Sequence, residues 1–230
     1  MAARTFTSAG DNNLWSNVAN WDGGATIPQE DDSVTIPAGQ TCEYDYNSAY
    51  TTGIAGITIN GTLKLTRSAG TYRLFMKAAA TIGGAGTFDC GASALDPIPF
   101  TAKHTITGGS GWYINGADGL AMTVYAAEPA TPTILLSGNE AIGQTEWSVD
   151  TNITGDIWAD GDTIRISDYT ALLESEERVI AAGGRAAGTL TVTAGLTAAK
   201  NTSAAIHLMT RNVQFIDRKS TRLNSSHIAV

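Results

Sequence analysis

The 230-residue chain has few of the residues on which many protein functions depend. It contains only two cysteines and three histidines, and 16% of its residues are charged. Two cysteines cannot form the disulfide framework of a small secreted domain, and the chain clusters too few ligands for a typical metal site. No apolar run approaches the roughly 18 residues of a membrane-spanning helix. The sequence therefore argues against a small disulfide-rich domain, a typical metal-binding protein and a membrane-spanning protein, and against a membrane as partner.

The cysteines and histidines that are present lie in strand-like segments. Cys42 and Cys90 occupy positions where an apolar side chain would face inward. We interpret them as two buried free thiols, with a disulfide as the alternative. His104 and His207 also lie inside strand-like runs, and we interpret each as structural rather than catalytic.

The segment from Asp217 to His227 has a different origin from the rest of the chain. It can be back-translated, codon by codon, into a common short-read sequencing adapter, and eleven residues in one frame would be a rare coincidence. We treat residues 217–230 as an adapter-derived tail, exclude them from fold reasoning and expect them to be unpacked. The natural protein is expected to continue past Ile216.

The chain is acidic. Its formal net charge is −8, and the tail contributes three basic residues and one acidic residue, a net +2, so that residues 1–216 carry −10. An acidic surface disfavours nucleic acid and anionic lipid as partners. The stretch from Met1 to Phe6 lacks the apolar core of a secretory signal. If Met1 is the true start, we expect no export by that route.

The abundant residues indicate β-structure. The chain has 25 glycines, and apolar residues alternate with polar ones in short runs that are broken by glycine and proline. The run Gly61-Thr-Leu63-Lys-Leu65 recurs 25 residues later as Gly86-Thr-Phe88-Asp-Cys90, and more loosely after 25 more as Gly111-Trp-Tyr113. A fixed period of this size predicts a solenoid of stacked coils. The residues expected to stack in adjacent coils are Ile57, Ile59, Leu63 and Leu65 on Ile82 and Phe88.

Further strands are predicted through the rest of the chain, with almost no helix. Only residues 170–176 favour a helical turn. No low-complexity linker divides the chain, so we expect an N-terminal arm over residues 1–11, one β domain over 12–216, and the tail over 217–230. The further strands are predicted at 120–125, 133–136, 145–149, 163–166, 177–180, 189–192 and 206–209.

Two groups of residues are candidates for a functional site. Asp156, Asp160 and Asp162 could form a calcium site or an acid/base pair, although the pattern Asp160-Gly161-Asp162 favours a tight turn before a strand. Trp112 and Tyr113 are the better candidates for a platform on which a sugar ring stacks, although packing in the core or at its rim is the favoured use of these rings. We assign no catalytic residue.

The order of several motifs resembles the eight-glycine (G-eight) domain, a β-rich module that leads into a right-handed parallel β-helix. The resemblance extends over residues 12–216 and implies an all-β, solenoid-like fold of stacked short strands, with a β-helix starting at about residue 210. The motifs are Trp15, Trp21 and Pro28, then Asp32-x-Val34-x-Ile36-x-x-Gly39, Ile59-x-Gly61-x-Leu63, Trp158-x-x-Gly161-Asp162-x-Ile164, Glu177 with Ile180, and Thr210-Arg211-Asn212-Val213.

The resemblance also implies a function outside the cell or at a surface. Members include animal cell-surface proteins that bind or degrade hyaluronan, fibrocystin-like receptors, and bacterial and phage structural proteins. With no signal segment visible, we expect a non-enzymatic structural or adhesive module of a phage virion or cell surface, with polysaccharide or other virion or surface proteins as partners. The alternatives are the N-terminal module of a polysaccharide-degrading enzyme and a bacterial surface adhesin.

Overall fold

The computed structural model describes residues 2–10, 12–127, 130–154, 158–168, 175–210 and 212–217. Within these residues the chain is all-β, and its one helix is a short 3-10 turn, η1 (Val18–Asn20). No helix in this part of the chain is long and apolar enough to cross a membrane. The chain divides into two compact units. Unit 1 contains residues 2–127 and the strand at 213–217, and unit 2 contains residues 130–210.

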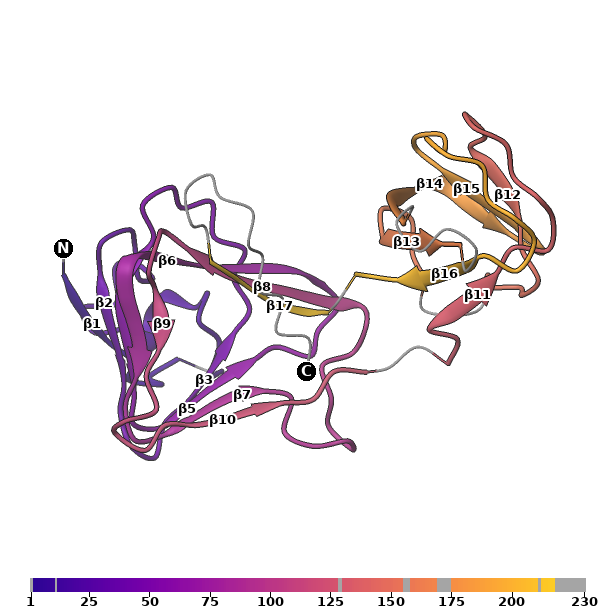
Figure 1. Cartoon of the computed structure of the whole chain (residues 1–230). Helices are drawn as coiled ribbons and strands as arrows, with labels where there is room; N and C mark the ends of the chain where they lie inside the picture. The colour runs from indigo at the N-terminus through magenta and orange to yellow at the C-terminus, as the bar shows by residue number, and fades with distance from the viewer. Residues whose placement is uncertain are drawn as a thin grey trace. The chain divides into compact units, whose positions relative to one another are not determined.

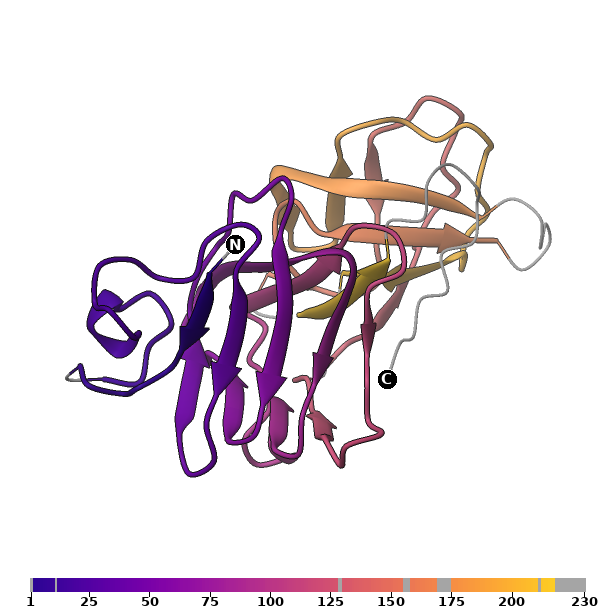
Figure 2. The ribbon, with the colours of Figure 1, turned by 90° about the vertical axis from the view of Figure 1, so that its left-hand side faces the viewer.

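Unit 1 is built from two parallel sheets (Figure 1). Figure 2 shows the first strands of these sheets side by side. One sheet has the order β1 (Ala3–Thr5), β2 (Ser33–Ile36), β4 (Ile54–Ile59), β6 (Gly70–Gly83), β8 (Ala102–Gly108) and β17 (Val213–Asp217), with β9 (Tyr113–Ile114) also paired to β6. The other has the order β10 (Ala121–Val124), β7 (Thr87–Cys90), β5 (Thr62–Leu65) and β3 (Thr41–Tyr44).

The 25-residue period is confirmed as the register between β4 and β6 in one sheet and between β5 and β7 in the other. Ile57 lies opposite Ile82, and Leu63 lies opposite Phe88. All four side chains are buried to 2% exposure or less. The chain alternates between the sheets, so that one strand from each sheet makes a rung of the stack. Because each rung buries its inner face mainly against its neighbours, the repeat carries the core of unit 1.

The repeated glycine is required by the close approach of neighbouring rungs. A Cβ atom at Gly86 would lie 2.0 Å from the main-chain oxygen of Gly61, and a Cβ atom at Gly61 would lie 2.2 Å from that of Gln40. Heavy atoms cannot approach so closely, so any other residue would push the strands apart. Of the two reasons for glycine at a corner, steric contact rather than positive φ applies here.

The prediction of a third copy of the repeat at Gly111 is wrong. Gly111 has φ of +76° and lies in the turn after β8, with open space around it. The next rung is formed by Ile114, which pairs with Ile82, and by Ala121, which pairs with Thr87. The connections in this rung are longer than in the earlier ones, so the 25-residue period ends after Gly86.

The cysteines and the N-terminal segment are both part of unit 1. Cys42 and Cys90 are buried and unpaired, as the favoured interpretation predicted. Burial raises the pKa of both thiols. The segment expected to be an N-terminal arm contains β1, which pairs in parallel with β2.

Unit 2 is a closed antiparallel barrel. Its sheet has the order β11 (Thr133–Leu135), β16 (Ala205–Leu208), β13 (Thr163–Ser167), β14 (Glu176–Ala186), β15 (Thr189–Val192) and β12 (Glu146–Ser148). The two outer strands then meet, because Leu136 bridges to Val149 and the Asp150 N–H donates to the Leu135 oxygen at 3.0 Å. Parallel stacking, expected for all of residues 12–216, therefore holds in unit 1 and not in unit 2.

The strands predicted in the C-terminal half can be compared with the observed strand bounds. The predicted strands of unit 2 are all present, within a few residues of the expected ends except that β14 continues to Ala186. Residues 170–174 of the predicted helical turn lie outside the described residues, and Glu176 already begins β14. In the adapter-derived tail only Asp217, the last residue of β17, is described. Leu223 and Ile228 lie outside the described residues.

Candidate functional site at the open end of unit 1

The two rings predicted to form a sugar platform point in different directions. Trp112 is only 9% exposed, and its indole N–H donates to the main-chain oxygen of Ile216 at 3.1 Å. Tyr113 begins β9 and is 53% exposed. Neighbouring residues in extended chain point to opposite faces. The structure therefore places Trp112 in the rim of the core and presents Tyr113 alone to solvent.

The predicted acidic site is built as a turn. Gly161 has φ of +85°, and the Asp162 carboxylate, which is buried, accepts the Ala159 N–H at 2.7 Å. Asp160 is exposed and accepts from Gly183 N–H at 2.7 Å and from Arg185 Nε at 3.1 Å. These bonds lower the pKa of Asp160. Asp156 lies outside the described residues, and the described residues contain no group of three or more His, Cys, Asp and Glu side chains placed to hold a metal ion.

Each of the two described histidines holds neighbouring segments together. His104 is 2% exposed, its Nε2 lies 2.8 Å from the Thr66 oxygen, and its ring stacks on Tyr72 at 4.8 Å. Burial lowers the pKa of His104 to about 4, so the ring is neutral at pH 7. In unit 2, His207 Nδ1 lies 2.9 Å from Thr133 Oγ1. Both contacts fit the structural interpretation.

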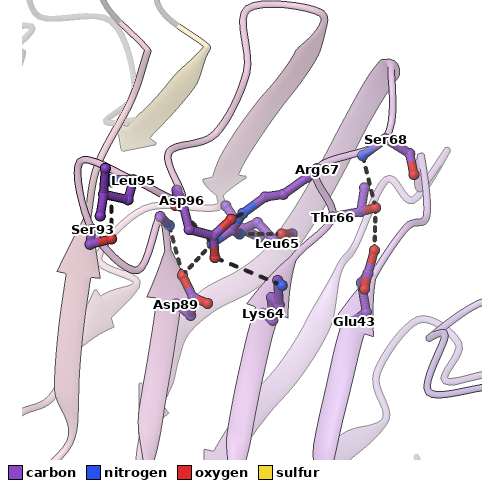
Figure 3. Close-up of polar contacts among 11 residues, drawn as sticks. Glu43, Lys64, Leu65, Thr66, Arg67, Ser68, Asp89, Ser93, Leu95 and Asp96 are labelled. Carbon is purple, nitrogen blue, oxygen red and sulfur yellow. Dashed lines mark hydrogen bonds and ion pairs between the residues drawn. The ribbon is translucent and has the colours of Figure 1, made fainter.

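A charged cluster that the sequence did not reveal lies on unit 1 at the ends of β5 and β7 (Figure 3). The Arg67 guanidinium donates to Asp89 Oδ1 at 2.8 Å, to both carboxylate oxygens of Asp96 at 3.3 Å, and to the Leu65 oxygen at 2.6 Å. Burial alone would lower the pKa of Arg67, but the bonds to the two carboxylates outweigh it and raise the pKa. Arg67 thus joins two strand ends and the turn at 93–96.

The same face carries a row of alternating charge. Glu43, Lys64 and Asp89 lie opposite one another on β3, β5 and β7. Opposite charges at directly paired positions stabilise a sheet. Asp89 and Asp96 share one guanidinium, so their chemistry is that of a structural ion cluster rather than of a proton-transfer pair.

One end of unit 1 is closed by aromatic rings. Phe6 and Trp15 each pack edge-on against Trp21, with ring centroids 5.3 Å and 4.8 Å apart, and Trp15 packs on Tyr44. The Trp21 indole N–H donates to the Trp15 oxygen at 2.8 Å. These four rings are exposed by 2% or less. The segment from 6 to 21 therefore covers the first rung.

A buried asparagine holds this cap in shape. The side-chain amide of Asn20 donates to the main-chain oxygens of Asn12 and Leu14 at 2.6 Å and 2.9 Å. Its side-chain oxygen accepts the Gly10 N–H at 2.8 Å. Asn20 is fully buried, and these bonds replace the water that the cap's main chain would otherwise need.

Among the residues that the structure describes, no strand covers the opposite end of unit 1. We give the name open rung to the three strands at this end of the sheets, β9 and β10 of one rung and β17 of the next, because each has one neighbouring strand and one free edge in the described part of the chain. An inward-facing row runs through Cys42, Leu63, Phe88 and Met122. The first three are 0% exposed, whereas Met122 is 37% exposed. The other apolar residues of the open rung are only partly buried: Ile114, Leu120, Val124, Val213 and Phe215.

The open rung combines free strand edges with an apolar face. Its unpaired N–H and C=O groups can pair with another strand, and its half-buried side chains can be covered by one. No single sequence motif marks this surface. It could be found only by counting rungs, because the last rung has the same alternation as the inner ones.

Comparison with known proteins is informative for the first half of the chain. Residues 20–120 match the family model described as the G8 domain. No match is found among curated proteins or solved structures. The matched segment begins in the aromatic cap and ends just before β10.

Proposed function

From the G8 domain that residues 20–120 form, we propose that this chain is a non-enzymatic structural or adhesive module of a phage virion or a cell-surface protein. In this proposal unit 1 is the capped beginning of a right-handed parallel β-helix. The aromatic cap closes one end, and the open rung receives the next coil.

The exposure of Met122 is the observation that carries the β-helix part of the proposal, whereas the structural or adhesive role follows from the G8 match. Met122 continues a row whose earlier members are completely buried, yet more than a third of its surface is exposed. Each apolar side chain left at the open rung forgoes burial worth about 25 cal/mol per Å². A further coil recovers this energy and pairs the free edges, as capped solenoids require.

The direction of the chain supports the same reading. β17 starts at Val213, opposite His104, and runs parallel to β8 for five residues. It therefore begins a rung beyond the one made by β8, β9 and β10. This start agrees with the expectation of a β-helix from about residue 210.

The arrangement of carboxylates supports a structural role. Glycoside hydrolysis generally uses two carboxyl groups about 5–10 Å apart, one of them free to donate a proton. Here Asp89 and Asp96 are tied to Arg67, and Asp160 is tied to Arg185. A glycan contact, if the module is adhesive, is best placed at Tyr113, whose ring is exposed at the open rung.

A polysaccharide assay tests this function against the enzyme alternative. The purified chain is incubated with hyaluronan and with bacterial exopolysaccharides, with and without calcium, and polymer length is followed by size-exclusion chromatography with light scattering. We expect no shortening. Reproducible shortening that Asp162→Asn abolishes, and that Glu146→Gln on the exposed surface leaves unchanged, would overturn the proposal.

A further inference from the structure

We propose that unit 2 is a self-contained barrel inserted between two successive rungs of unit 1, and that the coil passes from β10 to β17 without needing it. The inserted module is unit 2, residues 128–210. The evidence lies at the two points where the chain leaves and re-enters unit 1, and inside the barrel.

The chain leaves and re-enters unit 1 at the same main-chain oxygen. Ala127 N–H donates to the Ile98 oxygen at 2.9 Å, and the Asn212 side-chain amide donates to that oxygen as well. Asn212 is 2% exposed, and its own main-chain oxygen accepts the His104 N–H at 2.7 Å. Residues 127 and 212 are therefore neighbours in unit 1, although 84 residues separate them in the sequence.

The ladder of unit 1 resumes directly after the insertion. Val213 pairs with His104, one residue beyond Asn212, and the parallel register then continues to Asp217 opposite Gly108. Before the insertion, β10 holds its register on β7 through Val124 opposite Cys90. The stacking of unit 1 is thus complete on both sides of the break.

The barrel is closed on itself at its own ends. Its first and last strands pair, with Thr133 opposite His207, and the Leu208 N–H donates to the Pro132 oxygen at 3.2 Å. The Trp158 indole N–H donates to the Thr131 oxygen at 2.7 Å. Trp147, Trp158, Ile164, Ile166, Leu190 and Ile206 are all 0% exposed. A fold with joined ends and its own core is what a tolerated insertion requires.

A buried charge cluster adds to the barrel's independence. Lys200 Nζ, with a side chain 0% exposed, lies 3.1 Å from Glu176 Oε1, and Glu176 also binds Arg178. Glu176 further accepts the N–H groups of Thr197 and Ala198 at 2.8 Å and 2.9 Å. All of these partners belong to unit 2. The charged groups buried in the barrel therefore find their partners inside it and need none from unit 1.

Hydrogen exchange of the full chain in increasing urea tests the proposal, because it reports each unit separately. Ile82→Ala and Ile164→Ala are matched variants, since both side chains are 0% exposed and lie in central strands of their units. We expect each variant to speed exchange by unfolding only in its own unit, by tenfold or more. Equal acceleration in both units by either variant would overturn the proposal.

A second variant replaces residues 128–211 with Gly-Ser-Gly between Ala127 and Asn212, a linker that spans on the order of 10 Å. Peptides from β4, β5, β6 and β7 are expected to keep their protection within about twofold. When Asn212→Ala is added to the linker variant, the amides of β17 should be the first to lose protection from exchange. Loss of protection throughout unit 1 in the linker variant would contradict the insertion model.

Discussion

Met122 lies opposite Phe88 in the ladder that joins β10 to β7, yet Phe88 is 0% exposed and Met122 is 37% exposed. Both side chains point inward. Phe88 has a strand on each side of its own, whereas among the described residues Met122 has one on only one side. Phe88→Ala should lower the free energy of unfolding by about 3–5 kcal/mol. Met122→Ala, with less burial to lose, should cost about 1 kcal/mol. Urea denaturation compares the two, and an unchanged midpoint for Phe88→Ala would make the repeat assignment wrong.

The stability of unit 1 should fall as the pH falls below about 6.5 because of His104. Burial lowers its folded-state pKa from 6.5 to about 4. Between these values the unfolded chain binds a proton that the folded chain does not, so stability decreases with decreasing pH. From pH 7.5 to pH 4.5 this loss is about 2–3 kcal/mol. His104→Gln, which can still donate to the Thr66 oxygen, should reduce the loss by that amount, and an equal loss in both proteins would contradict the assignment.

The Arg67 cluster should contribute more to the free energy of unfolding than an ordinary surface ion pair does. Arg67→Lys removes the planar fork that reaches Asp89, Asp96 and the Leu65 oxygen, so it should cost about 1–3 kcal/mol. Lys64→Ala is the matched control, since Lys64 Nζ lies 4.0 Å from Asp96 in a partly exposed pair, worth about 0–1 kcal/mol. Chemical denaturation measures both. Equal effects would mean that Arg67 acts only as a surface charge.

The aromatic cap should depend on Asn20. Asn20→Ala removes the side-chain bonds to the Asn12 oxygen and the Gly10 N–H and one of the two bonds to the Leu14 oxygen, at a cost of about 1–3 kcal/mol. Hydrogen exchange should speed up first in residues 12–21. Asn13→Ala, at an exposed neighbouring position, should leave exchange unchanged. If both variants behave alike, the cap is not held by Asn20.

The repeated part of the fold could be predicted from the sequence because its causes are local. Alternation placed Ile57 and Ile82 inward, and the glycine at 61 and 86 marked where rungs approach closely. Strand alternation alone does not specify whether a neighbouring strand is parallel. This is why the antiparallel barrel was not predicted, although its start carries Pro129 and Pro132, two of the six prolines of the chain.

The candidate site was harder to predict because it depends on turns and on distant partners. The turn at Gly111 sets which way Trp112 points, and a shift of one residue reverses the face. Arg67 meets Asp96 only because a loop returns over the sheet, 29 residues later. The open rung follows from the end of the stack, which no single residue signals.

Hydrogen exchange at β10 tests the central claim most directly. A version in which the natural reading frame replaces the adapter-derived tail after Ile216 is expressed beside the present chain. Exchange is measured for the amides of Ala121–Val124, with Thr62–Leu65 of β5, paired on both sides, as the internal control. If the open rung receives a further coil, the amides of β10 that face its free edge exchange slowly in the longer protein and rapidly in this one, while β5 does not change. Equally rapid exchange at β10 in both proteins would contradict the account.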